Sequence, residues 1–226
     1  MQNTSDSTVP SSPHIRIAMP IRLLLVACVL ALSYFPWLPF PWRMPLVGLL
    51  GVTLVWMETR SSSSCGLHLR SFGQTLVWMA LLVGIVVGLV DPLIQPLVDQ
   101  LTDTKADYSG YGPLLGNLPA AMTLVAGAWL SAAVGEELVF RAFLMHQLHV
   151  LFALLPGRIY FASLTGGLVF GLMHANQGLS GIVVTGLVGA LFGFAYLRSG
   201  RNLWSLVLAH GLIDTWGVMT LYLGWY

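Results

Sequence analysis

The stretch LPAAMTLVAGAWLSAAVGEELVFRAFLMHQLHV, residues 118 to 150, decides how this chain folds. It is apolar over a length sufficient to cross a bilayer, since a spanning helix needs about 20 predominantly apolar residues. Glu136, Glu137 and Arg141 nevertheless lie inside it, and apolar sequence continues beyond them. Charges at this depth are costly and usually serve a function. The stretch therefore predicts a membrane helix that carries part of a functional site.

The whole chain has the composition of an integral membrane protein. Of its 226 residues, 56% are hydrophobic and only 8% are charged, against about 25% charged residues in soluble domains. We expect an all-α, polytopic transmembrane bundle of about seven spans, with roughly six to eight allowed because the second candidate is short enough to be re-entrant. The candidate spans are residues 20–38, 44–58, 73–91, 118–150, 159–175, 179–198 and 202–223.

The domain organisation is simple. Residues 1–13 are polar and rich in Pro and Ser, which predicts a disordered tail. Nothing marks a second domain, so residues 14–226 are expected to form one transmembrane domain, in which residues 118–216 carry the motifs. The first apolar run lacks a small-x-small cleavage site and is interpreted as a span, not as a signal peptide. The net charge of +1 offers no basic surface for nucleic acid, so the expected partners are the bilayer and molecules held in it.

The distribution of arginines predicts the orientation. The loop expected over residues 91–113 holds four aspartates against a lone Lys105, and Arg43 falls on the same side as that loop. Because cytoplasmic loops are enriched in Lys and Arg, we expect a multi-pass protein with a cytoplasmic amino terminus, in the plasma membrane if the source is bacterial. The arginines that define the cytoplasmic side are Arg16, Arg22, Arg60, Arg70, Arg158, Arg198 and Arg201.

The three charges of the opening stretch differ in their helical positions. Residues four apart share a helix face, so Glu137 and Arg141 are placed to form an ion pair. Glu136 lies about 100° further round the helix and is left free. A helix end emerging into water would also tolerate these charges, but the apolar run AFLMHQLHVLF that follows argues against it.

Other ionisable residues occupy comparable positions in later spans. FGLMHANQG places His174 four residues after Phe170, and LAHGLIDTWG places His210 and Asp214 four apart, so each pair shares a helix face. At 1.5 Å per residue, the turn LLPGR brings His174 back to the depth of Glu136, and the last span reaches a similar depth. We expect these side chains to converge in one polar pocket, nearer the face opposite the basic loops.

Such a pocket suits hydrolysis inside a membrane. Peptide-bond hydrolysis needs a base that takes a proton from water and donors aimed at the developing oxyanion. A carboxylate beside an imidazole supplies the base. Two histidines and a carboxylate are also a catalytic zinc set, for which the ligands would be Glu136, His174 and His210. Because these residues are spread over three helices with no HExxH motif, we expect no cofactor and keep zinc as the alternative.

The motifs EExxxR, FxxxH and HxxxD, in this order on three apolar spans, resemble the CPBP family of intramembrane proteases, the relatives of the CAAX prenyl endopeptidase Rce1 and of bacterial Abi proteins. The resemblance implies a helical membrane enzyme that cleaves a membrane-associated protein or peptide, in Rce1 after a prenylated cysteine. It implies that Glu136 and His174 activate water and that His210 and Asp214 form the oxyanion site. It implies supporting roles for Glu137, Arg141 and Phe170.

Asp214 departs from the prenyl-protease pattern, which usually has Asn at this position. An ionised carboxylate only accepts hydrogen bonds, so it cannot copy an amide donor. Either Asp214 is protonated and donates, or it is charged and orients a protonated His210 that donates alone. We favour the second role. The departure makes a prenylated substrate less certain than proteolysis itself.

Other interpretations stay open. A catalytically idle scaffold or immunity protein of the same family would keep the fold, and a transporter would also use intramembrane charges, although no inverted repeat supports one. A rhomboid-like pair of Ser180 with His210 leaves the acids unexplained, and Ser180 is more simply the N-cap of the next span. His146 and His149 are expected at the cytoplasmic interface. Small residues that allow close helix contact are Gly166, Gly167, Gly171, Gly186, Gly189 and Gly193.

Overall fold

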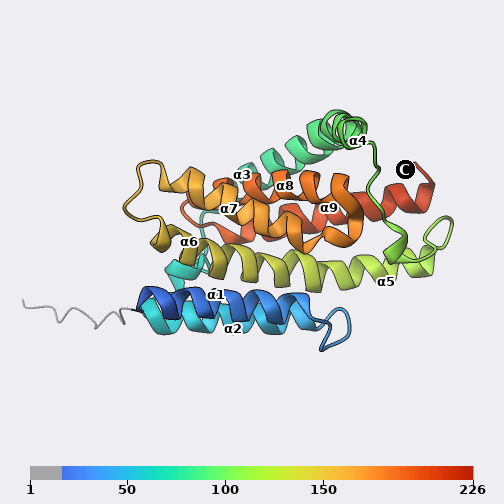
Figure 1. The fold of residues 1–226 in the computed structure, drawn as a ribbon. Helices are drawn as coiled ribbons and strands as arrows, with labels where there is room; N and C mark the ends of the chain where they lie inside the picture. The colour runs from blue at the N-terminus through green and yellow to red at the C-terminus, as the bar shows by residue number, and fades with distance from the viewer. Residues whose placement is uncertain (1–16, 226) are drawn as a thin grey trace, which may run out of the picture.

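The computed structural model describes residues 17–225, and this range contains helices and no β-strand. The predicted disordered tail, residues 1–13, lies outside the described residues. Figure 1 shows long helices running side by side, with the α1–α2 hairpin on one side of the helix formed by residues 118–151 and with α7, α8 and α9 on the other. The segment from α3 to α4 packs beyond them, against α9 and α8.

Each of the seven predicted spans corresponds to a helical segment. Four of these are long and apolar enough to cross a membrane, and α1 and α7 are shorter apolar helices. The prediction of an all-α integral membrane protein is therefore confirmed. The spans are α1 (Met19–Tyr34), α2 (Arg43–Thr59), α3 (Phe72–Ile85) continuing through η2 (Val86–Ile94) into α4 (Gln95–Thr102), α5 (Leu118–Ala128) continuing through η4 (Trp129–Leu144) into α6 (Met145–Leu151), α7 (Arg158–Met173), α8 (Gly178–Arg198) and α9 (Leu203–Leu223), with short 3₁₀ turns η1 (Ser62–Cys65), η3 (Ser109–Tyr111) and η5 (Ala175–Gln177).

The third span is longer than the sequence predicts. Helical structure continues to Thr102, so the predicted end at residue 91 and the predicted loop over 91–102 are wrong. Pro92 lies within η2, where the backbone is π-helical. The wider π turn tolerates a residue that has no amide hydrogen, and proline therefore does not end the helix here. Asp91 consequently lies on a helix and not in a loop.

Ser180 also differs from its prediction. It lies inside α8, whose N-cap is Gln177, so the expected N-cap role is wrong. Its buried hydroxyl donates to Asp99 and accepts a hydrogen bond from Gln95 Nε2 at 2.9 Å. These contacts join α4 to α8. They do not support a Ser180–His210 pair.

The span that carries the charges does not break at them. Helical structure runs from Leu118 to Leu151, and the acids and Arg141 lie in the π-helical segment η4. π-helical insertions are frequently found at functional sites, because they redirect side chains without ending the helix.

Glycines bring α7 and α8 into backbone contact. A Cβ added to Gly167 would lie 2.6 Å from the Gly186 carbonyl oxygen, and one on Gly171 would lie 2.4 Å from that of Ile182. A Cβ on Gly189 would meet Phe170 at 2.9 Å. The expected close approach is confirmed, and it fixes the helix that ends at His174.

A buried polar cluster joins the helices at the end of the bundle that carries the basic loops. Arg22 forms an ion pair with Glu58 at 2.5 Å, and Glu58 also contacts His146 Nε2 at 3.2 Å. Gln147 accepts from Arg22 and donates to Glu58. His146 is only 5% exposed, so its side chain is buried between helices at this end of the bundle. The cluster therefore joins α1, α2 and α6.

The basic loops lie together, as the orientation argument requires. Arg70 donates to the carbonyl oxygen of Gly200, and Arg201 donates to that of Ser64. These bonds tie the segment between α2 and α3 to the segment between α8 and α9. Arg43 lies at the opposite end of α2 from Arg60.

Candidate active site

One cavity of about 900 Å³ is lined by all four residues that are predicted to be catalytic. Glu136, His174, His210 and Asp214 line it, and so do residues of the loops at the end of the bundle opposite the basic loops. The predicted convergence of three spans on one polar pocket is therefore present in the structure.

Glu137 lies behind the cavity wall and is completely buried. Its Oε1 atom lies 2.9 Å from an Arg141 guanidinium nitrogen, which is the ion pair that the spacing predicts. The same oxygen lies 2.8 Å from His210 Nδ1. The sequence analysis did not anticipate this second contact. Glu137 thus connects the helix of the acids directly to α9.

Arg141 is held among aromatic rings. Its guanidinium carbon lies 4.9 Å from the centre of the Phe170 ring and 5.1 Å from that of Phe192. A cation over ring faces is attracted by the ring quadrupole, more strongly when water is excluded. The FxxxH and EExxxR motifs are therefore in direct contact, because the Phe170 ring covers the Arg141 guanidinium.

His210 has a carboxylate near each ring nitrogen. Nδ1 contacts Glu137, and Nε2 lies 3.7 Å from Asp214 Oδ1, which is beyond hydrogen-bond distance. The Phe192 ring meets the imidazole edge to face at 5.9 Å. With Nδ1 donating to Glu137, the Nε2 side of the ring is the one available to a bound molecule.

His174 ends α7. Its backbone leaves the helical conformation at φ −102° and ψ 22°, and its Nδ1 atom lies 2.8 Å from the Phe170 carbonyl oxygen. A carbonyl oxygen only accepts, so Nδ1 carries the hydrogen in this contact. A neutral His174 therefore presents Nε2 as a proton acceptor.

Glu136 is the carboxylate without a bracing partner, as its helical position predicts. It lines the cavity and is half-buried. Its Oε2 atom is buried and has no hydrogen-bond partner among the described residues. An unsatisfied carboxylate oxygen is costly in a protein interior. Water or substrate is the natural partner for it.

Tyr111 is a site residue that the sequence analysis missed. It comes from the loop before α5, lines the same cavity, and its hydroxyl accepts a hydrogen bond from Gln177 Nε2 at 3.1 Å. Burial of the hydroxyl, with the nearby carboxylates of Asp214 and Glu136, raises the pKa of Tyr111 to about 12. The hydroxyl is therefore a donor at neutral pH. The two tyrosines of the short run YSGYG, residues 108–112, were the available signal.

The zinc alternative names Glu136, His174 and His210 as ligands. Within residues 17–225, no group of three or more His, Cys, Asp or Glu side chains is placed to hold a metal ion. The Nδ1 atoms of His174 and His210 are engaged by Phe170 and Glu137, and their Nε2 atoms are left for the cavity.

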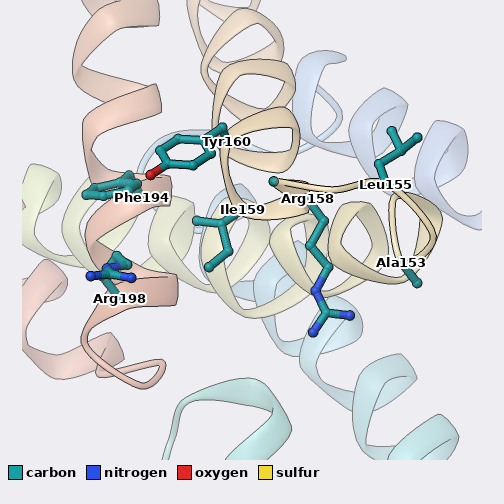
Figure 2. Close-up of a pocket in the computed structure, with 8 residues that line it drawn as sticks. Ala153, Leu155, Arg158, Ile159, Tyr160, Phe194 and Arg198 are labelled. Atoms are coloured by element: carbon teal, nitrogen blue, oxygen red, sulfur yellow. The ribbon is translucent and has the colours of Figure 1, made fainter.

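A second, smaller hollow lies away from these residues. It has a volume of about 430 Å³ and is formed by the α6–α7 loop and the ends of α7 and α8. Figure 2 shows Tyr160 beside Phe194 and the guanidinium of Arg198 near the same ring. The two rings stack at 5.8 Å. This hollow contains no acid or histidine and offers no hydrolytic chemistry.

Comparison with known proteins agrees with the motifs. No curated protein and no solved structure matches the chain. Residues 118–216, the segment that holds every motif residue, match the family described as type II CAAX prenyl endopeptidase Rce1-like, which confirms the resemblance to the intramembrane proteases.

Proposed function

We propose that this protein is an intramembrane endopeptidase that hydrolyses a peptide bond of a membrane-associated protein or peptide. The convergence of Glu136, His174, His210 and Asp214 from three spans on one cavity carries the proposal. The family match over residues 118–216 supports it independently.

In the proposed reaction, Glu136 and His174 activate a water molecule. Glu136 takes a proton from the water while His174 Nε2 orients it, and the resulting hydroxide attacks the carbonyl carbon of the scissile bond. The proton held by Glu136 then passes to the leaving nitrogen as the carbon–nitrogen bond breaks. The unpartnered Oε2 of Glu136 and the outward-facing Nε2 of His174 support these assignments.

His210 is proposed to stabilise the oxyanion. With Nδ1 bonded to Glu137, a protonated His210 directs its Nε2–H into the cavity, where it can donate to the developing negative oxygen. Asp214, 3.7 Å from Nε2, is proposed to stay charged and to hold the imidazolium in place. Glu137, Arg141 and Phe170 support the ring from behind. No metal takes part in this scheme.

The proposed substrate class is a CAAX-type peptide, lipidated or held at the membrane by another anchor. The description of the matched family supports the prenylated form, whereas Asp214 in place of Asn keeps other anchors open. The proposed location is a multi-pass position in the plasma membrane if the source is bacterial, with the amino terminus in the cytoplasm. The clustered basic loops support that orientation.

An idle scaffold or immunity protein of the same family is the second candidate. It would share the fold and would not need the residues of the cavity. A transporter would need a path across the bilayer, and the sequence shows no inverted repeat of the kind that many transporters use. Neither alternative explains why the buried Oε2 atom of Glu136 has no hydrogen-bond partner among the described residues.

Purified protein in detergent should cleave an S-farnesylated CAAX peptide or another membrane-anchored peptide. Glu136→Gln and His174→Ala should each lower turnover by about 10² to 10⁴, the usual cost of removing a general base, while keeping the wild-type unfolding temperature. Asp91→Asn is the matched control, since it removes a carboxylate from another wall of the same cavity. Wild-type protein that cleaves none of these peptides favours the scaffold. A Glu136→Gln variant with more than about a tenth of wild-type turnover removes Glu136 from the base role.

A further inference from the structure

Arg43 is the arginine that departs from the basic-loop pattern, and it lines the cavity that contains Glu136. It is the first residue of α2 and is half-buried. Its Nε atom is buried and has no hydrogen-bond partner. Within residues 17–225, neither a hydrogen bond nor an ion pair reaches its guanidinium.

The first turn of α2 is held firmly against the helix of the acids. A Cβ added to Gly135 would lie 2.7 Å from the carbonyl carbon and from the Cβ of Met44. Backbone contact therefore occurs between the neighbour of Arg43 and the neighbour of Glu136. A Cβ on Gly48, one turn further along α2, would lie 2.6 Å from Leu138 Cβ, so the contact extends along the helix. The backbone at Arg43 is thus held in place beside the cavity.

The acids of the site leave this cation unpaired. Glu137 is taken by Arg141 and His210, and Asp214 lies nearest His210. A partly buried charge without a partner is unfavourable, and a bound anion would relieve that cost. The planar guanidinium fork matches the two oxygens of a carboxylate, which it can bind through two parallel hydrogen bonds.

We propose that Arg43 binds the C-terminal carboxylate of the peptide substrate. This inference rests on the proposed endopeptidase function. Binding of the carboxylate by Arg43 would fix the distance between the C-terminus of the substrate and its scissile bond, so that the enzyme removes a short C-terminal peptide. The peptide carboxylate is favoured over a lipid phosphate because Arg43 faces the same cavity that the scissile bond must enter. Arg43 also lies outside the segment that matches the family, so the matched segment alone does not supply this contact.

The test uses two S-farnesylated CAAX peptides that differ only in a free or an amidated C-terminus. Their dissociation constants are measured with full-length Glu136→Gln protein in phosphatidylcholine nanodiscs, where binding does not depend on turnover. The free acid should bind about 10- to 100-fold more tightly than the amide, as expected for hydrogen bonds to a charged group. Adding Arg43→Gln should remove that preference by weakening only the free acid, and Arg43→Lys should keep part of it. Arg60→Gln, which removes a cation at the other end of the same helix, should leave the preference intact.

The outcomes separate this inference from the proposed function. Equal binding of acid and amide to protein that retains Arg43, or equal weakening of both by Arg43→Gln, overturns the carboxylate assignment even if the wild-type enzyme cleaves. A lipid phosphate site would give a different pair of results. Protein that retains Arg43 would lose its preference for the free acid in nanodiscs containing phosphatidylglycerol, and Arg43→Gln would leave that preference unchanged in phosphatidylcholine. This pair of results also overturns the carboxylate assignment. An acid preference that requires Arg43, in a protein whose wild type cleaves neither peptide, supports the binding site and refutes the endopeptidase. Unfolding temperatures check that every variant is folded.

Discussion

Replacing Glu137 by Gln should destabilise the protein and inactivate it, whereas the same change at Glu136 should only inactivate it. Glu137 is fully buried, and a single oxygen contacts both Arg141, at 2.9 Å, and His210, at 2.8 Å. At 2.9 Å and an effective dielectric constant of about 20, the gross attraction to Arg141 is about 6 kcal/mol. Leaving one partner of a buried ion pair alone typically costs about 3–5 kcal/mol.

The assay is thermal unfolding in detergent, together with peptide turnover. For a chain of this size, the expected loss corresponds to a fall in Tm on the order of 10 °C. The double change Glu137→Gln with Arg141→Met should recover much of the lost stability without recovering activity, because it removes the stranded charge. A Glu137→Gln variant that unfolds at the wild-type temperature and retains full turnover would refute the ion-pair argument.

Three further predictions concern the cavity. Asp214→Asn should lower turnover by roughly tenfold, because a charged carboxylate no longer orients His210; unchanged turnover in both Asn and Ala variants would take Asp214 out of the site. Active protein washed with chelator should contain far less than one zinc per chain by elemental analysis. If instead it contains one zinc per chain, and His174→Ala and His210→Ala each lose both the zinc and the activity, the mechanism is metal-assisted. Tyr111→Phe should lower kcat/KM by about tenfold, and by the same factor at each pH between about 6 and 9. The reason is that a pKa of about 12 keeps the Tyr111 hydroxyl protonated over this whole range. A loss of kcat/KM that grows with pH across this range would contradict the donor role of Tyr111.

Much of this architecture follows from one-dimensional patterns, because a bilayer imposes strict requirements on length and polarity. Helix periodicity placed Glu137 beside Arg141 and left Glu136 free, and counting residues through the turn after α6 brought His174 to the depth of Glu136. The bond between Glu137 and His210 could not be predicted, because it depends on how α9 is rotated about its axis. Periodicity fixes which residues share a face but not which neighbour that face meets.

The differences between prediction and structure have equally specific causes. The apolar run of the third predicted span ends at Asp91, so the sequence suggested a loop from there, whereas the helix continues through Pro92 in a π-helical turn. His146 was expected at the cytoplasmic interface because it lies near the end of its span, and that position does not show how far neighbouring helices bury the side chain. Its partner, Glu58, lies 88 residues away in the chain, and only the packing of α2 against η4, which continues into α6, reveals the pair.

The cluster at the basic end of the bundle has a consequence for how the chain enters the membrane. Arg22 and Glu58 are 36 residues apart, whereas Gln147 lies 125 residues after Arg22. During synthesis from the amino terminus, the α1–α2 hairpin is therefore complete long before α6 exists. The two opposite charges can neutralise each other within the hairpin, which lowers the cost of transferring either one from the translocon into lipid. The hairpin can thus be inserted in the bilayer as a unit before α6 is synthesised. Gln147 and His146 then form hydrogen bonds with Arg22 and Glu58.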